Sequence, residues 1–272
     1  MLGRAATETQ ITHGRRLWLY AVAGLILLFL ILPSLIVMPL SFSADRYLTF
    51  PPSGWSTRWY EAYFGAIEWW DATRTSFIAA FLTTLVATAL GTLAAYGLHT
   101  SGSRWSRALY VGFMLPLIIP GILVAIGVFL LYANFGLNNS MLGIVLAHSV
   151  MAIPLVVITV ASSLKSFDMN LEMAARSLGA SRAWAFLTIT LPQIKIAVVS
   201  GALLAFITSL DEVAISLFIA GGENATLTRR MFNALRDEID PTIAAISTLL
   251  IVISVLLMGM TQFLQRSGQR QG

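Results

Sequence analysis

The sequence predicts an all-α integral membrane protein with six transmembrane helices, and three observations support this fold class. Apolar residues make up 57% of the 272 residues and charged residues only 11%, whereas a soluble domain carries about 25% charged residues. The mean hydropathy is +0.79. Uncharged runs long enough to cross a membrane, which takes about 20 apolar residues, recur along the chain.

The uncharged runs give the bounds of the six helices in order. The first run starts after Arg16, and it exceeds the roughly 7–15 residues of a signal-peptide core, so we expect it to be retained. The run from 108 to 164 is too long for one helix and contains the polar stretch NFGLNNS, which predicts two spans joined by a turn. We expect spans at about 17–42, 75–99, 108–132, 139–163, 196–220 and 242–264.

The charges predict how these spans are oriented. The pattern divides the chain into an N-terminal tail at 1–16, a membrane domain at 17–265 with a polar loop at 165–195, and a C-terminal tail at 266–272. Eleven of the 17 Lys and Arg residues fall on the side that holds both tails and the polar loop. Positively charged loops stay in the cytoplasm. We therefore expect both termini and the polar loop to be cytoplasmic.

Several classes of function are excluded by what the sequence lacks. There is no cysteine, which excludes disulfides, thiol catalysis and cysteine-based metal sites. Neither an HExxH nor a GxSxG motif is present, and the three histidines have no metal-ligand spacing. A phosphate-binding Walker A loop is also missing. We expect no enzyme, no metal site and no nucleic-acid partner.

The polar loop carries the pattern of two short helices joined by a turn. Asp168 is a suitable N-cap for the first helix, Gly179 suits the position after its end, and Ser181 can cap a second helix that Pro192 ends before the fifth span. Apolar and small residues recur on one face of the first helix, namely Leu171, Ala174, Ala175 and Leu178. That face fits either an amphipathic helix on the lipid surface or a docking surface for another subunit.

Ionisable and kinking residues within the spans are candidates for a translocation pathway. Asp211 and Glu212 interrupt the fifth span, and an acid at membrane depth normally faces a cavity or a partner. They line the path and attract a cationic amine, or they pair with a neighbouring helix near His148. Adjacent residues on a helix point about 100° apart, and our hypothesis is that Asp211 faces the pore. Pro120 and His148 are the other pathway candidates.

The polar loop resembles the EAA loop of ABC importer permeases. The family pattern places Glu-Ala-Ala, Gly and Ile-x-Leu-Pro at fixed spacing, and this chain has Met173-Ala174-Ala175, Gly179 and Ile189-Thr190-Leu191-Pro192. Met173 stands where the family often has Glu, and Glu172 lies one residue earlier. Further segments, among them STRWYEAYF, MLPLIIPGILVAIGVFLL and SLDEVAISLFIAGG, resemble the second permease type of the spermidine/putrescine importers.

This resemblance covers about residues 17–265 and implies a type I ABC importer membrane domain with a MetI-like core, in the bacterial inner membrane. It implies that the chain forms half of a translocation pathway for a small amine such as a polyamine. A related amino-acid derivative is the alternative cargo, because Gly121 stands where polyamine permeases often carry an acid. The implied partners are a second permease, two ATPase subunits that bind ATP and Mg²⁺, a periplasmic binding protein and membrane lipid. The implied ATPase-coupling residues are Leu171, Glu172, Ala174, Ala175, Leu178 and Gly179.

An ion-coupled secondary transporter is the alternative class. It would use Asp211 and Glu212 as its ion relay and would transport without ATP. It offers no reason for the spaced pattern of the polar loop.

Overall fold

The computed structural model describes residues 16–237 and 240–269 and is built from helices. The predicted tail at 1–16, apart from Arg16, and the end of the predicted tail at 266–272 lie outside these residues. The helices are α1 (Leu17–Leu40), α2 (Arg58–Gly65), α3 (Ile67–Thr100), α4 (Ser106–Ile118), α5 (Gly121–Ala133), α6 (Met141–Ser166), α7 (Met169–Ser177), α8 (Arg182–Ala185), the π-helix η2 (Phe186–Thr190), α9 (Leu191–Leu210), α10 (Ala214–Ile219), the 3₁₀-helix η3 (Gly222–Asn224), α11 (Leu227–Asp237) and α12 (Thr242–Gln269).

Five helical stretches within the described residues are long and apolar enough to cross a membrane. They are 17–40, 67–100, 141–166, 182–210 and 242–260. The pair α4–α5 makes a sixth if the two helices count as one bent span. The all-helical membrane fold predicted from the sequence is therefore confirmed, and the count of six depends on how this pair is placed in the bilayer.

The chain divides into two compact units, which are described separately. The first holds α1, the segment that follows it, most of α2 and the beginning of α12, up to Ile251. Within it, the Ser41 hydroxyl lies 2.8 Å from the Tyr60 hydroxyl, and the rings of Phe42 and Tyr60 are 5.1 Å apart. Most apolar side chains of α1 up to Leu35 are exposed, as expected of a helix whose surroundings are lipid.

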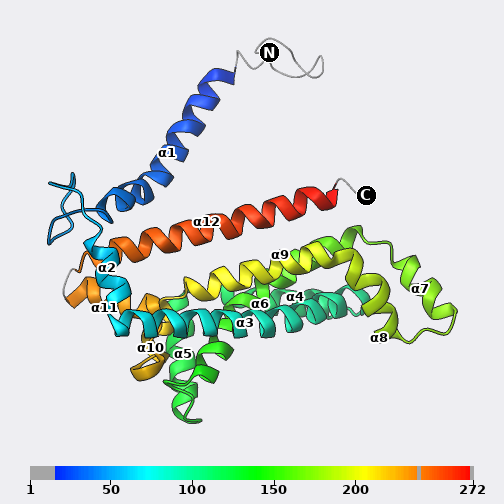
Figure 1. Ribbon diagram of the computed structural model, residues 1–272. Helices are drawn as coiled ribbons and strands as arrows, with labels where there is room; N and C mark the ends of the chain where they lie inside the picture. The colour runs from blue at the N-terminus through cyan, green and yellow to red at the C-terminus, as the bar shows by residue number, and fades with distance from the viewer. Residues whose placement is uncertain (1–15, 238–239, 270–272) are drawn as a thin grey trace. The chain divides into compact units, whose positions relative to one another are not determined.

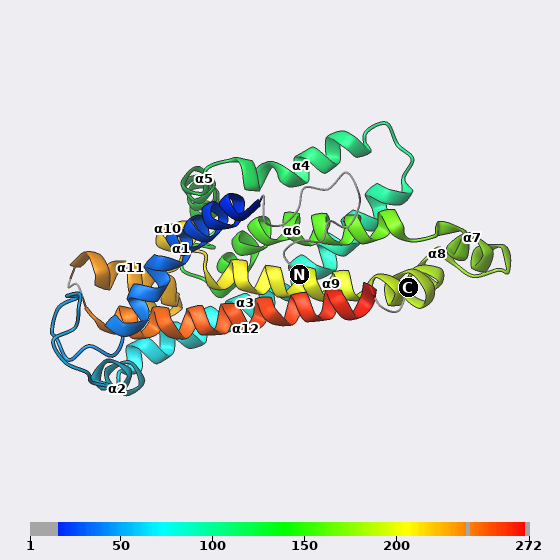
Figure 2. The ribbon, with the colours of Figure 1, turned by 90° about the horizontal axis from the view of Figure 1, so that it is seen from above.

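The second unit is organised around α3, α6 and α9, which lie side by side (Figures 1 and 2). Their shared core contains small and β-branched residues, among them Ala87, Ala152, Val157, Val160 and Ala205. Small residues let membrane helices approach closely, so that dispersion contacts hold them together in an environment as apolar as they are.

Two glycines bring their helices close to Val156 of α6. A Cβ atom added at Gly91 of α3 would lie 2.7 Å from the Val156 Cβ, and one added at Gly201 of α9 would lie 3.3 Å from the Val156 Cα. Both values are shorter than ordinary van der Waals contact between carbon atoms. The two glycines therefore set the spacing of all three helices.

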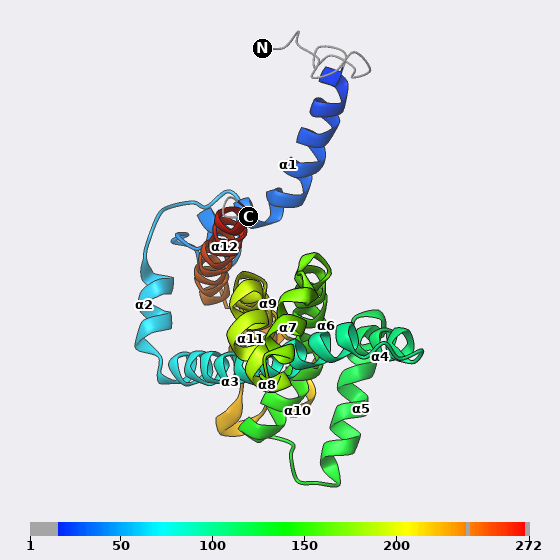
Figure 3. The same cartoon turned by 90° about the vertical axis from the view of Figure 1, so that its right-hand side faces the viewer.

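The third predicted span, 108–132, is broken rather than continuous. α4 ends at Ile118, α5 begins at Gly121, and the two helix axes differ in direction by 100°. Figure 3 shows α5 turning away from α4. Pro120 is the N-cap of α5 and its extended backbone ends the helical path, since a proline ring is incompatible with the preceding helical turn. The sequence predicted a bend here but not a break.

The fifth predicted span also differs from a single helix at 196–220. It begins earlier, because α8, η2 and α9 form one helical stretch from Arg182 to Leu210, and it stops at Leu210. The prediction that Pro192 ends the preceding helix is wrong, because Pro192 lies in the first turn of α9, where a missing N–H is tolerated. The short helix α10 follows after a break at 211–213.

Candidate functional site

Outside the α3–α6–α9 core, the polar loop forms the short helix α7 and, after a turn, α8, which begins the stretch that continues into α9 (Figure 1). The Asn170 N–H donates to the Asp168 carboxylate at 3.0 Å, and the Trp184 N–H donates to the Ser181 hydroxyl at 3.2 Å. Gly179 has a φ of +96°, a conformation that glycine adopts without strain. The predicted caps and turn are therefore confirmed, and they rest on local sequence rules alone.

The stripe predicted on α7 and its end is not covered by the rest of the chain. Leu171, Ala174 and Leu178 are exposed, Leu178 to 91%, and Ala175 is half-buried. An uncovered apolar stripe at the edge of a membrane bundle is a surface able to bind another subunit.

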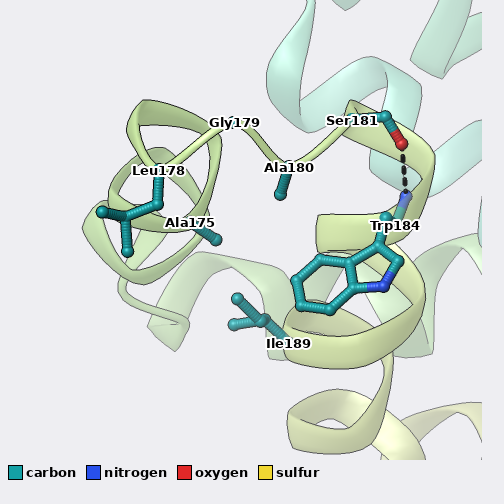
Figure 4. Close-up of a pocket in the computed structure, with 7 residues that line it drawn as sticks. All are labelled: Ala175, Leu178, Gly179, Ala180, Ser181, Trp184 and Ile189. Atoms are coloured by element: carbon teal, nitrogen blue, oxygen red, sulfur yellow. Dashed lines mark hydrogen bonds between the residues drawn. The ribbon is translucent and has the colours of Figure 1, made fainter.

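A hollow of about 540 Å³ lies beside this stripe, between α7 and the start of α8. Figure 4 shows Ala175 facing Trp184 and Ile189 across it. The lining residues are Ala175, Leu178, Gly179, Ala180, Ser181, Trp184 and Ile189. The lining is mainly apolar, so the hollow suits an apolar side chain from a partner. The stripe and the hollow together are called the loop surface below.

Glu172 is adjacent to the stripe on α7, but its side chain points into the chain. Its side chain is 2% exposed, and its two carboxylate oxygens accept hydrogen bonds from the Tyr96 hydroxyl at 2.5 Å and the Thr190 hydroxyl at 2.6 Å. The sequence grouped Glu172 with the coupling residues, and the structure places it inside the chain. Tyr96 and Thr190 were missed because they are 76 and 18 residues away in sequence.

The two acids of the fifth predicted span lie at the break between α9 and α10, called the α9–α10 break below. Asp211 is the C-cap of α9 and is exposed; within the described residues its carboxylate accepts no hydrogen bond. The Glu212 carboxylate accepts the Ile215 N–H at 3.0 Å and so caps α10. Because the helix ends at Leu210, the argument from a 100° helical offset does not apply to this pair.

His148 holds both sides of this break from α6. It is 1% exposed, with Nδ1 at 2.8 Å from the Ser209 hydroxyl before the break and Nε2 at 3.2 Å from the Ser216 hydroxyl after it. A neutral imidazole has one donor and one acceptor nitrogen, so it can satisfy two hydroxyl groups. His148 thus has the helix-bridging arrangement, with serines as its partners rather than Asp211 or Glu212.

Pro120, the last pathway candidate, lies at the α4–α5 bend and is exposed. Its neighbour Gly121 lies close to α10, because a Cβ added there would be 3.7 Å from the Ala214 Cβ. The bend and the α9–α10 break are therefore adjacent. The structure brings Pro120, His148, Asp211 and Glu212 to one end of the unit, and the loop surface lies at the other end of α9.

Two arginines near this end have different surroundings. Arg230 pairs with Glu68 and lies over the Trp69 ring, with its Cζ 5.1 Å from the ring centroid. Arg229 is half-buried, and burial lowers the pKa of its guanidinium. An added Cβ at Gly221 would lie 2.9 Å from an Arg229 nitrogen, so this glycine makes room for the side chain.

Among the described residues, no group of three His, Asp or Glu side chains could hold a metal ion. What the arrangement provides is an uncovered loop surface at one end of a helical membrane bundle and interrupted helices at the other.

The chain belongs to the family of binding-protein-dependent transport system inner membrane components, whose sequence profile matches residues 87–268. It is 33% identical over 239 residues to the spermidine/putrescine transport system permease protein PotC of Haemophilus influenzae, covering 88% of this chain and 92% of that protein. It is 32% identical to the putrescine transport system permease protein PotI of Escherichia coli K12, covering 86% of this chain and 85% of that protein. The protein is thus a permease subunit of an ABC importer in the inner membrane, and not an enzyme.

The fold agrees with solved ABC importers. A bacterial ABC transporter involved in the import of the acidic polysaccharide alginate matches with a TM-score of 0.67 at 15% identity, covering 95% of this chain and 98% of that chain. The MetNI methionine ABC transporter matches with a TM-score of 0.54 at 17% identity, covering 73% of this chain and 93% of that chain. The predicted type I importer fold is therefore confirmed.

Proposed function

We propose that this permease subunit imports a small cationic amine and is driven by an ATPase that binds the loop surface. The observation that carries the proposal is the uncovered stripe of α7, with Leu178 exposed to 91% beside an apolar hollow. The loop is held in place by its own helix caps and by the hydrogen bonds of Glu172. A displacement of α7 by the ATPase can therefore be passed on to the spans without deforming the loop. Leu171, Ala174, Ala175, Leu178 and Gly179 form the contact.

The small side chains of the loop surface support close contact with a second subunit. Ala174, Ala175 and Gly179 let a partner approach the α7 backbone, while Leu171 and Leu178 supply apolar area. Burying a leucine side chain stabilises a complex by roughly 1.5–3 kcal/mol. We propose that this surface lies in the cytoplasm, together with both chain termini, in line with the excess of Lys and Arg on that side.

The proposed cargo is a polyamine or a related amino-acid derivative. The relatives reported above are named for spermidine and putrescine. Asp211 is exposed at the α9–α10 break, where a carboxylate can attract a cationic amine. Gly121 supplies no second acid beside Pro120, which leaves room for a cargo with a single positive charge.

The proposed assembly contains a second permease, two ATPase copies that bind ATP and Mg²⁺, and a periplasmic binding protein. The support is the family membership, because its description names binding-protein-dependent transport. The second permease supplies the other half of the pathway. In this assembly the membrane domain is 17–265 and the coupling loop is 165–195.

Single-cysteine crosslinking tests the coupling surface, because the chain has no cysteine of its own. Ala175→Cys and Leu178→Cys are placed on the loop surface, and Ala108→Cys, exposed on α4, is the control. Native membranes are crosslinked and the adducts identified by mass spectrometry. We expect an adduct with a nucleotide-binding ATPase from positions 175 and 178 but not from 108.

The partner found in this way also tests the cargo. The ATPase adduct identifies the assembly, and its binding protein can then be titrated with putrescine and with spermidine. If positions 175 and 178 give no ATPase adduct in membranes where the folded chain is abundant, the loop surface is not the coupling site. If ATP depletion also leaves uptake unchanged, an ion-coupled mechanism through Asp211 and Glu212 replaces the proposal.

A further inference from the structure

Glu172 is a buried acid, and contact with an ATPase would not explain why it is buried. It lies on α7, the helix of the loop surface, yet only 2% of it is exposed. Its Oε1 accepts from the Tyr96 hydroxyl of α3 at 2.5 Å, and its Oε2 accepts from the Thr190 hydroxyl at the end of η2 at 2.6 Å. Each carboxylate oxygen is thus bound to a different helical stretch that crosses the membrane.

Tyr96 is itself fixed by a second layer of contacts. Arg182 donates from Nε to the Tyr96 hydroxyl at 3.3 Å, and its guanidinium lies 5.4 Å from the centre of the Tyr96 ring. Arg182 also donates to the Thr100 hydroxyl. The Phe186 ring packs against Tyr96 with 4.5 Å between centroids. The Tyr96 side chain therefore cannot move with Glu172 unless α3 moves with it.

The π-helix η2 accounts for the position of Thr190. The Leu191 N–H donates to the Phe186 carbonyl, five residues back, which defines a widened turn. Pro192 follows and cannot donate to the carbonyl of residue 188, a deficit that a widened turn accommodates. The extra residue in this turn changes the direction of the side chains around it, and Thr190 is fully buried against Glu172.

The hydrogen bonds of Glu172 couple the position of α7 to the positions of α3 and η2. Hydrogen bonds to a charged group are shorter and stronger than neutral ones, and a buried carboxylate that loses its partners is strongly destabilised. Bonds of 2.5 and 2.6 Å do not survive a displacement of about 1 Å. A shift of α7 therefore has to be followed by α3 and by the stretch that leads into α9.

We propose that Glu172, Tyr96 and Thr190 form the internal link that transfers movement of α7 to α3 and α9. Glu172 is then a positioning residue that acts within the chain, and it makes no contact with the ATPase. The link rests on the proposed function, since it has a role only if a partner moves α7. It also connects the loop surface to the α9–α10 break, because α9 (Leu191–Leu210) begins directly after Thr190 and ends directly before Asp211.

The test uses the complete transporter and a readout that is independent of cargo. A reporter, Val213→Cys, is placed at the α9–α10 break, and its labelling rate with a maleimide is measured with and without ATP plus vanadate. Tyr96→Phe and Thr190→Val each remove one hydroxyl. Thr190→Ser keeps the hydroxyl, and Thr188→Val is the matched control, because the exposed Thr188 donates only to the Trp184 carbonyl.

We expect ATP plus vanadate to change the labelling rate in the parent, in Thr190→Ser and in Thr188→Val. In Tyr96→Phe and Thr190→Val the change should fall roughly tenfold, as expected from losing one hydrogen bond to a charged group, while Leu178→Cys still crosslinks to the ATPase. A full ATP response in the Tyr96→Phe, Thr190→Val double variant, with that crosslink intact, would overturn the link. Absence of the ATPase crosslink from Leu178→Cys when Tyr96 and Thr190 are unchanged would instead overturn the proposed function.

Discussion

α9 is interrupted at both ends, and the two interruptions are stabilised by different chemistry. At its start, the widened turn of η2 is bound by the carboxylate of Glu172 through Thr190. At its end, the α9–α10 break is bridged by the imidazole of His148 through Ser209 and Ser216. In both places one buried ionisable side chain from another helix holds an irregular backbone.

The difference between the two residues follows from what each has to hold. A carboxylate accepts only, so it gathers hydroxyl donors and binds them through charge. A neutral imidazole donates on one side and accepts on the other, which suits two similar serines. The end next to the proposed coupling surface thus has the stronger connection, and the end that contains the pathway candidates has the weaker one. Irregular membrane helices are tolerated where neighbouring helices satisfy their polar groups, and both ends follow this rule.

The largest effect on folding is expected from Glu172→Ala. The change leaves the Tyr96 and Thr190 hydroxyls without their acceptor and opens a cavity, which together should lower the free energy of unfolding by about 3 kcal/mol. Unfolding in a denaturing detergent measures the loss. Glu212→Ala is the control, because Glu212 is only half-buried and accepts a single capping bond, so about 1 kcal/mol is expected. Equal losses in both variants would contradict the comparison.

His148→Ala should have the second largest effect. It removes two neutral hydrogen bonds and leaves a cavity, for an expected loss of about 2 kcal/mol. The α9–α10 break should also loosen, so that Val213→Cys reacts faster with a maleimide in this background. Ser209→Ala and Ser216→Ala should each reproduce about half of the stability loss. If the reaction rate at position 213 stays the same in all three variants, His148 does not hold the break.

The smallest effect on folding is expected from Asp211→Asn. The residue is exposed and its carboxylate makes no hydrogen bond within the described residues, so the free energy of unfolding should change by less than about 0.5 kcal/mol. Uptake of labelled putrescine should nevertheless fall severalfold, because a cation loses an attracting charge. Glu212→Gln, which keeps an oxygen to cap α10, is the control for uptake. Unchanged transport by Asp211→Asn in an assembled complex would remove this residue from the pathway.

Local rules allowed much of the loop surface to be predicted from the sequence. Asp168, Gly179 and Ser181 have their expected roles because a cap or a turn depends on residues within four positions. The exposure of Leu178 could also be predicted, since the sequence contains no nearby segment that could cover it. The class of protein followed from the spaced pattern around Gly179 and from the uncharged runs.

The polar contacts inside the bundle could not be predicted in this way. Glu172 looked like a surface residue on a polar loop, because its partner Tyr96 lies in an apolar span far away in sequence. Asp211 and Glu212 were visible as unusual acids, but the end of the helix at Leu210 was not, since no proline or glycine marks it. The 100° bend before Gly121 likewise exceeds what two prolines predict by themselves.

The contact at Val156 limits the motions that the core can make. At Gly91 and Gly201 the helices lie too close to Val156 to admit another methyl group, and drawing α3, α6 and α9 apart would forfeit their dispersion contacts. Motions that carry the three helices together preserve these contacts, whereas motions that separate one helix from the others lose them.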